Sequence, residues 1–131
     1  MIRWGEPVSF TIRFGANGAN KTFVLEGIRD KATQQWAMVI AAGQEIQFFT
    51  SPNLLDWEFR SRFIGGHRVG VWAVPDLFPL EIDGETKWVL LVSVTTLAPA
   101  GGSGTQYFVG DFDGQTFTND NPTSILWLDY G

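Results

Sequence analysis

The chain has 131 residues, of which 44% are hydrophobic, 15% aromatic and 18% charged, a balance typical of one globular domain. Its formal net charge of −5 argues against a nucleic-acid partner, because phosphate binding requires clustered Lys and Arg. The absence of cysteine excludes disulfides, thiolate metal sites and a cysteine nucleophile.

The beginning of the chain has no long apolar segment after Met1, so we expect no signal peptide in it. No apolar run approaches the roughly 20 residues of a membrane span, so we also expect a soluble protein without a membrane partner. The cellular compartment stays undetermined.

Residues 1–27 predict a β-hairpin whose origin the sequence does not reveal. Residues 7–14 alternate apolar and polar side chains, the period of a half-buried strand. A turn-forming cluster, GANGAN at 15–20, separates them from a second candidate strand at 21–27.

The rest of the chain continues as strands and turns with hardly a helix. Strand-like apolar runs occupy residues 36–43, 45–51, 57–63, 70–82, 87–96, 105–112 and 123–130. Asp-Gly pairs at 83–84 and 113–114 are strong hairpin signals. Residues 97–104 (LAPAGGSG) lie between two of the runs, so they predict a surface loop. We therefore expect one all-β domain over residues 1–131, as a sandwich, barrel or propeller.

Several phrases occur together in one order: IRDK at 28–31, the strands at 36–63, VWAVPDLFPL at 71–80, KWVLLVSV at 87–94, GGSGTQYFVGDFDGQTF at 101–117 and ILWLDYG at 125–131. This order resembles the glycoside hydrolase family 32, the levanase, inulinase and invertase family of fructan hydrolases. The resemblance covers about residues 28–131. It implies antiparallel, four-stranded-type sheets from two to three blades of a five-bladed β-propeller. A rearranged β-sandwich across an oligomer is the alternative.

The resemblance also implies which residues belonged to a sugar site. The family uses an Asp nucleophile, a Glu acid/base in a Trp-Glu-Cys-Pro block and the Asp of Arg-Asp-Pro to hold sugar hydroxyls. Arg29 and Asp30 match the last block, and Trp72 matches the Trp of the second, so these three are the vestigial substrate-binding candidates. Ala73 stands where the family has its acid/base Glu, and Val74 where it has Cys.

The catalytic pair is therefore missing, and we assign no catalytic residue. Retaining glycoside hydrolysis needs two carboxyl groups about 5–5.5 Å apart, and the nucleophile block has no counterpart in the chain. Other carboxylates have no evident partner for catalysis in the sequence: Glu26, Asp76, Asp111, Asp113 and Asp129. For Asp111 and Asp113 the simpler, structural interpretation is a role in a hairpin turn. The structural alternative to sugar binding is an ion pair for Arg29 with Asp30, and core packing for Trp72.

No metal and no cofactor are expected. His67 lies in a Gly-rich loop without a second His or Cys, so the sequence does not support a metal site there. The GGSG stretch lacks the Lys and the helix of a phosphate loop.

Two segments resemble trimmed versions of family segments. Only KATQQ, residues 31–35, separates Asp30 from Trp36, too few for the extra strand that family members place there. Residues 65–72 look like a shortened loop.

Three functions follow as expectations. The first is an inactive fragment or engineered derivative of a fructan hydrolase, which folds and self-associates through β-sheet edges, most simply as a dimer. The second is a glycoside hydrolase acting on fructans or sucrose. The third is a carbohydrate-binding module that holds fructose-containing saccharides through Arg29, Asp30 and Trp72.

Overall fold

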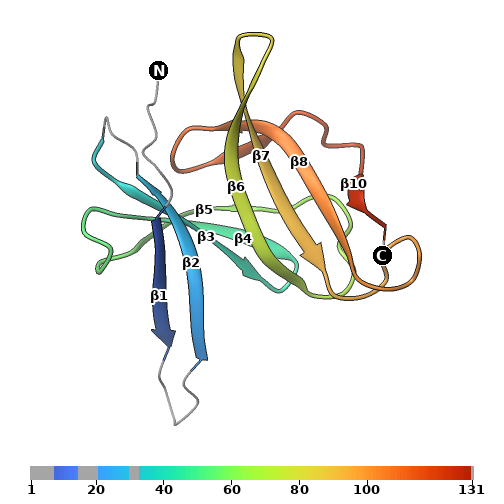
Figure 1. Cartoon of the computed structure of the whole chain (residues 1–131), viewed down its shortest axis with the longest axis horizontal. Helices are drawn as coiled ribbons and strands as arrows, with labels where there is room; N and C mark the ends of the chain where they lie inside the picture. Colours follow the sequence, from blue (N-terminus) through green and yellow to red (C-terminus); the bar gives the residue numbers. More distant parts are fainter. Residues whose placement is uncertain (1–7, 15–20, 30–32, 131) are drawn as a thin grey trace.

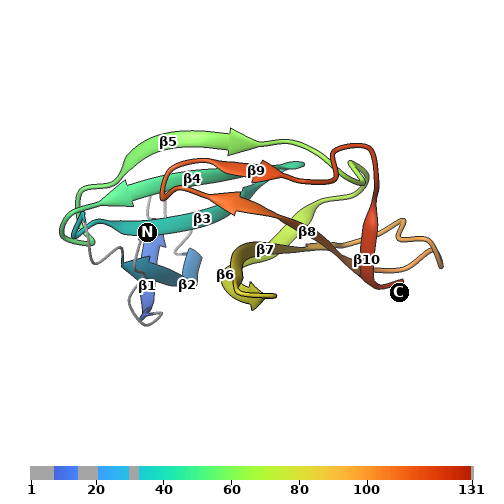
Figure 2. The same cartoon turned by 90° about the horizontal axis from the view of Figure 1, so that it is seen from above.

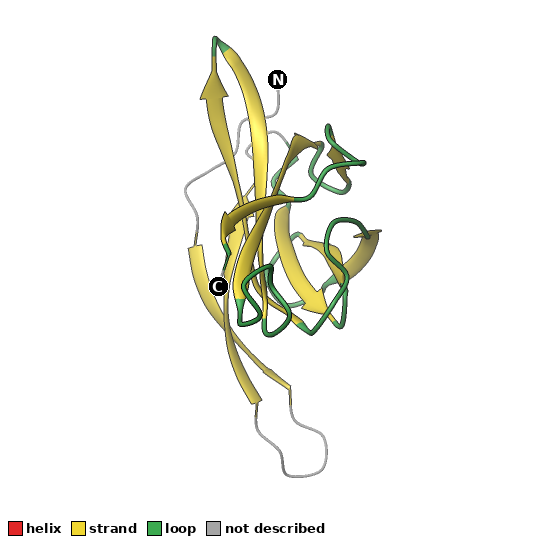
Figure 3. Cartoon of the chain, turned by 90° about the vertical axis from the view of Figure 1, so that its right-hand side faces the viewer, coloured by secondary structure: helices red, strands yellow, loops and turns green. Residues whose placement is uncertain are grey.

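The computed structural model describes residues 8–14, 21–29 and 33–130, with side-chain detail from residue 33 onward. These residues form strands and loops without a helix, and therefore without a helix that could cross a membrane (Figures 1 and 3). The strands are β1 (Val8–Phe14), β2 (Lys21–Arg29), β3 (Trp36–Ala42), β4 (Glu45–Ser51), β5 (Glu58–Phe63), β6 (Trp72–Ile82), β7 (Glu85–Val94), β8 (Gly104–Phe112), β9 (Phe117–Asn119) and β10 (Leu126–Asp129).

The strands form two antiparallel sheets. The first sheet has the order β1-β2-β3-β4-β5, and the second has the order β10-β8-β7-β6, with β9 paired to β8. Figure 2 shows β3, β4 and β5 side by side in one layer and β6 and β7 in a second layer. The β1–β2 and β6–β7 hairpins project from opposite ends of the molecule (Figure 1). The all-β, antiparallel prediction is confirmed.

The core lies between the inner faces of the two sheets. Alternate residues along β4, β7 and β8 are buried, as the period-2 pattern predicts: Ile46, Phe48, Trp88, Leu90, Val92, Val94, Phe108 and Phe112. Aromatic rings join the sheets edge to face, with Phe63 and Phe108 4.8 Å apart between ring centroids. Burial of one such side chain stabilises the fold by about 1.5–3 kcal/mol.

The opposite face of the second sheet, called here the outer face, is apolar in its middle and mixed toward the β6–β7 turn, where Leu80 lies opposite Lys87 and Ile82 opposite Glu85. The register places Phe78, Val89 and Val109 on it in one row across β6, β7 and β8. Leu80 and Ile82 continue the row along the projecting part of β6, where they are 46% and 47% exposed.

The turns follow the sequence signals closely. Asp83 and Gly84 have φ angles of 52° and 78°, as a tight hairpin between β6 and β7 requires. Residues 97–103 form the expected loop between β7 and β8. The short strand β9 was not predicted, because three residues are too few to show an alternation. The predicted turn at 15–20 lies outside the described residues.

The segment between Arg29 and Trp36 contains no strand over its described residues, 33–35. The last three residues of β2 pair with the first three of β3, so that Arg29 lies opposite Trp36. The N-terminal hairpin therefore supplies the strand beside β3.

Candidate functional site

The first candidate site is a bulge at the start of β6, called here the β6 bulge. Ala73 pairs with Ser93, but the next paired residue, Asp76, lies opposite Leu91, so β6 carries one extra residue. Val74 within the bulge has a φ of 42°, a left-handed conformation that is unusual for a β-branched side chain, and is 74% exposed. The bulge interrupts the alternation and re-aims the side chains around it.

Trp72, immediately before the bulge, belongs to the core. It is 2% exposed, and its indole Nε1 donates a hydrogen bond of 3.0 Å to the carbonyl oxygen of His67. Its backbone N–H donates to the carbonyl of Gly43, which ties β6 to the β3–β4 turn. The packing interpretation of Trp72 is therefore the one that its burial supports, since the ring is not open to a sugar here.

Ala73 presents only a half-buried methyl group at the bulge. Asp76 is the next carboxylate along β6, and it alternates with the buried Leu77, so its side chain points away from the core. No group of three or more His, Asp or Glu side chains able to hold a metal ion occurs in the described part of the chain.

The other two predicted binding residues are only partly placed. Arg29 ends β2, and its backbone pairs with Trp36. Its side chain is not among those that the structure describes. Asp30 is outside the described residues altogether. Grouping Arg29, Asp30 and Trp72 as a sugar grip thus stays a prediction.

The loop that carries His67 is fastened to β8 by a buried amide. Gln106 is fully buried, and its Oε1 accepts a hydrogen bond of 2.9 Å from the backbone N–H of His67. Its Nε2 donates to the His67 carbonyl at 3.3 Å. The His67 ring contacts Leu97 O through Nε2 at 2.8 Å and packs edge-on against Trp127. His67 is therefore a structural residue in this loop.

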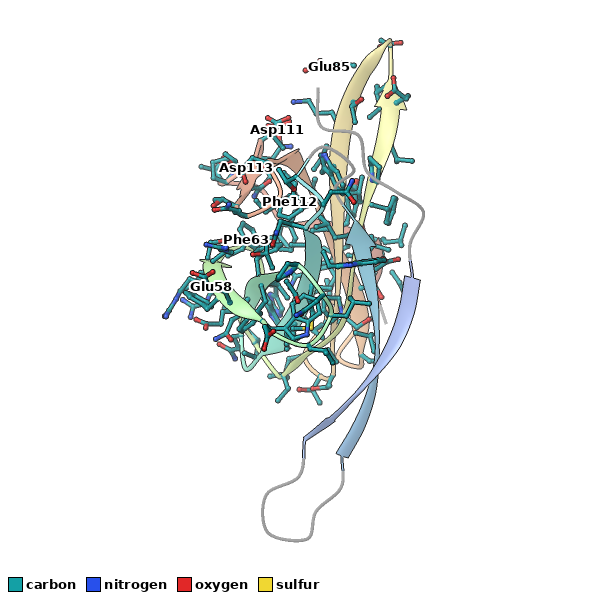
Figure 4. The ribbon with its side chains drawn as sticks, turned by 90° about the vertical axis from the view of Figure 1, so that its left-hand side faces the viewer. Glu58, Phe63, Glu85, Asp111, Phe112 and Asp113 are labelled. Atoms are coloured by element: carbon teal, nitrogen blue, oxygen red, sulfur yellow. The ribbon has the colours of Figure 1, made fainter. Side chains whose placement is uncertain are left out.

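A second candidate site, which the sequence analysis did not find, is a polar cleft. It lies where β3 begins, between β5 and the β8–β9 turn. It is lined by Thr33, Gln35, Trp36, Ala37, Thr50, Arg60, Asp113, Gly114 and Gln115, and offers ≈ 60 Å³ to the centres of water-sized groups. Figure 4 shows Glu58 of β5 and Asp113 of the β8–β9 turn on the same side of the molecule. Ser61 Oγ donates to the Gln115 carbonyl, joining that turn to β5.

A bulge in β5 directs Arg60 into this polar cleft. Phe48 pairs with Ser61 and Phe49 with Phe59, which leaves Arg60 as the extra residue. Its Nε donates a 2.7 Å hydrogen bond to Thr50 Oγ1. Its Nη2 lies 2.8 Å from a carboxylate oxygen of Glu58. The guanidinium is thereby held in one orientation.

The β8–β9 turn is held by its own carboxylate and by a lysine. Asp113 Oδ1 accepts hydrogen bonds from the backbone N–H groups of Gln115 and Thr116 at 2.9 and 2.8 Å, which confirms its role as a turn residue. Lys87 on β7 contacts Asp120 at 3.1 Å and Asp111 at 3.4 Å. The hydrogen bond to Asp120, more than that to Asp111, raises the pKa of Lys87 above its usual value, while desolvation opposes this.

This fold and the sequence block at the β6 bulge define a class: part of a β-propeller of the glycoside hydrolase type. The family described as Glycosyl hydrolases family 32 N-terminal domain matches residues 25–131, and the chain belongs to this family. The N-terminal domain of the family is a five-bladed β-propeller, which confirms the predicted family and the partial propeller.

The chain is similar to curated enzymes and to solved structures. It is 52% identical over 104 residues to the levanase of Bacillus subtilis (strain 168), covering 75% of this chain and 15% of the levanase. It is 43% identical over 113 residues to an extracellular exo-inulinase of Aspergillus niger, covering 76% of this chain and 21% of that protein. The structure of fructofuranosidase from Schwanniomyces occidentalis complexed with fructose has a TM-score of 0.74 and 35% identity, covering 80% of this chain and 21% of that chain.

The chain thus spans between about one seventh and one fifth of the length of these relatives. Their activities belong to the longer proteins.

Proposed function

We propose that this chain is a non-catalytic member of family 32 that assembles with a second copy of itself. Its relatives are glycoside hydrolases, but the matched part is a small share of each. Two observations carry the proposal: the β6 bulge has no acid/base side chain at Ala73, and the apolar row on β6 ends in Leu80 and Ile82, which are 46% and 47% exposed.

The chemistry of the β6 bulge supports the absence of cleavage. By resemblance, Ala73 stands where the family has its proton donor, and a methyl group cannot protonate a leaving oxygen. Asp76 lies beyond the bulge, with its side chain away from the core. The shifted register separates its position from that of Ala73 along the strand.

The outer face of the second sheet supports assembly. Phe78, Leu80 and Ile82 follow one another on one face of β6. Among the described residues no strand pairs with the free edge of β6, whose Trp72 N–H donates to the Gly43 carbonyl at its first residue. A two-fold axis along β6 would bring this apolar row onto its own copy, so that each chain covers the other. Exposed edges and apolar rows of this kind favour such contacts.

Light scattering of the wild-type chain at micromolar concentration tests the assembly. We expect the mass of a dimer, and the mass of a monomer for the double variant Leu80→Lys with Ile82→Lys. The variant Leu55→Lys is the matched control, because Leu55 is 82% exposed in the β4–β5 loop and lies outside the outer face. A wild-type monomer would contradict the assembly.

Release of fructose from sucrose, inulin and levan tests the lack of cleavage. We expect none from the wild type and none from Ala73→Glu, because one restored carboxylate still lacks its partner. Fructose release by the purified wild type, lost on Asp30→Asn, would support the hydrolase alternative instead.

A further inference from the structure

The polar cleft lies far from the β6 bulge. Trp36 lines the cleft at the first residue of β3, whereas Gly43, just after the end of β3, accepts the hydrogen bond of Trp72. Trp36 and Gly43 are seven positions apart along β3 and its end, and at a rise of about 3.3 Å per residue this is roughly 23 Å. A ligand in the polar cleft would therefore not contact the position of the lost acid/base group.

The polar cleft contains hydrogen-bond donor and acceptor atoms that the described residues do not use among themselves. Arg60 uses Nε and Nη2 on Thr50 and Glu58, so its Nη1 has no partner among the described residues. Asp113 uses Oδ1 in its turn, and its Oδ2 is likewise without a partner there. Gln35 and Gln115 add side-chain amides, each with both donor and acceptor atoms.

The charges around the polar cleft favour a neutral ligand. Arg60 contributes one positive charge, but Glu58 already contacts it at 2.8 Å, and Asp113 adds a negative charge in the lining. An anionic ligand would face two carboxylates for one guanidinium, and like charges at this range repel. A hydroxyl group suits the site because it can donate to Asp113 and accept from Arg60.

The size and the aromatic wall narrow the ligand further. A volume of ≈ 60 Å³ for the centres of water-sized groups holds about four to six hydroxyl-sized groups, taking about 10–15 Å³ for each. Trp36 adds half-buried indole surface beside the polar groups, and apolar surface with a few placed polar groups is the usual make-up of a small-molecule site. One edge of a sugar ring combines these features.

We infer that the polar cleft binds the edge of one neutral sugar residue, with its hydroxyls on Arg60, Gln35 and Asp113 and its ring against Trp36. This site depends neither on the β6 bulge nor on assembly through the outer face. The inference can therefore be right or wrong independently of the proposed function.

A titration followed by two-dimensional ¹H–¹⁵N NMR tests this inference, with fructosylnystose as the probe. We expect saturable shifts of the Trp36 indole N–H, the Arg60 Nε–H and the side-chain amide of Gln35. Because a hydrogen bond from a charged donor is lost, Arg60→Ala should weaken binding by about tenfold or more. Gln35→Ala should weaken it less.

The variant Arg62→Ala is the matched control, with the same substitution two residues along β5. Its guanidinium lies 3.7 Å from Glu45 and over the ring of Phe59, outside the polar cleft, so binding should be unchanged. Should Arg60→Ala lose the folded spectrum, Gln35→Ala decides, since Gln35 lies before β3 and not within a strand.

Three results would overturn the inference. The first is a titration without shifts at Trp36, Arg60 and Gln35. The second is binding that neither variant at Arg60 or Gln35 weakens. The third comes from a parallel titration with inorganic phosphate: shifts in the polar cleft with phosphate alone would mean an anion site.

Discussion

The two bulged edge strands, β5 and β6, use the same backbone device with different outcomes. In β5 the extra residue is Arg60, whose guanidinium is fixed by Thr50 and Glu58 at the rim of a polar cleft. In β6 the two residues of the bulge are Val74 and Pro75, which together lie opposite Val92 and offer no polar side chain. A bulge supplies a direction, and the residue in it supplies the chemistry. The bulge and the side chain that it carries are encoded separately, so the side chain can change while the bulge is kept.

The two bulges also differ in their surroundings, since one adjoins the core and the other lies at the surface. The β6 bulge adjoins the core through Trp72 and through the loop that Gln106 fastens. The β5 bulge lies at the surface, against a hairpin turn. Substitutions near β6 should therefore change stability, and substitutions near β5 should change binding.

The largest expected effect is that of Trp72→Ala. Truncating a 2%-exposed Trp in the core should cost about 3–5 kcal/mol of unfolding free energy. Urea unfolding followed by circular dichroism measures it. Trp57→Ala, at a half-buried Trp outside the core cluster, should cost clearly less. Unchanged stability with altered sugar binding would reverse the comparison between the two bulges.

The next effect in size is that of Gly110→Ala in β8. A Cβ at this position would collide with the carbonyl group of Thr118, so the β8–β9 hairpin would have to move. We expect a cost of about 1–3 kcal/mol, the usual range for overpacking, and a displaced Asp113 turn. Gly102→Ala is the control, because a Cβ there meets no atom within 4 Å. Equal thermal stability of the two variants would speak against the close approach of β9.

A smaller effect is expected for Arg60→Ala, which removes the donor to the buried Thr50 hydroxyl. The loss should be about 1–2 kcal/mol, as for a buried polar group that loses its partner. Arg62→Ala breaks only an exposed contact, and its effect should stay within about 0.5 kcal/mol. Urea unfolding of both variants in parallel gives the difference. Equal losses would mean that the β5 bulge does not hold Arg60 in place.

The smallest expected effect concerns Lys87 and its dependence on pH. Because the folded-state pKa is raised, the ammonium group stabilises the fold below its unfolded pKa of about 10.4, and the contribution disappears as the pH rises through the folded pKa. Lys87→Met should therefore lower stability slightly at neutral pH and not at strongly alkaline pH. Lys87→Arg, which keeps the charge, should retain stability at both. Unfolding curves at the two pH values provide the measurement.

The sequence by itself determined the strands, the turns and the family. Alternating apolar residues placed nine of the ten strands within a few residues of their observed bounds, and Asp83-Gly84 specified its hairpin turn. These signals are local, since the two-residue period of a strand and the φ of a turn residue depend on near neighbours. The resemblance to the family block also predicts, from the sequence alone, that Ala73 stands at the position of the acid/base Glu.

Only the tertiary structure decided where the polar side chains gather. The polar cleft joins Gln35, Arg60 and Asp113, which are distant in sequence and meet because the β8–β9 turn packs on β5. The one-residue slip that aims Arg60 arises from its pairing with β4, and the burial of Gln106 arises from the contact between a loop and β8. Register shifts and contacts between sheets depend on both partners at once, so no single segment of the sequence contains them.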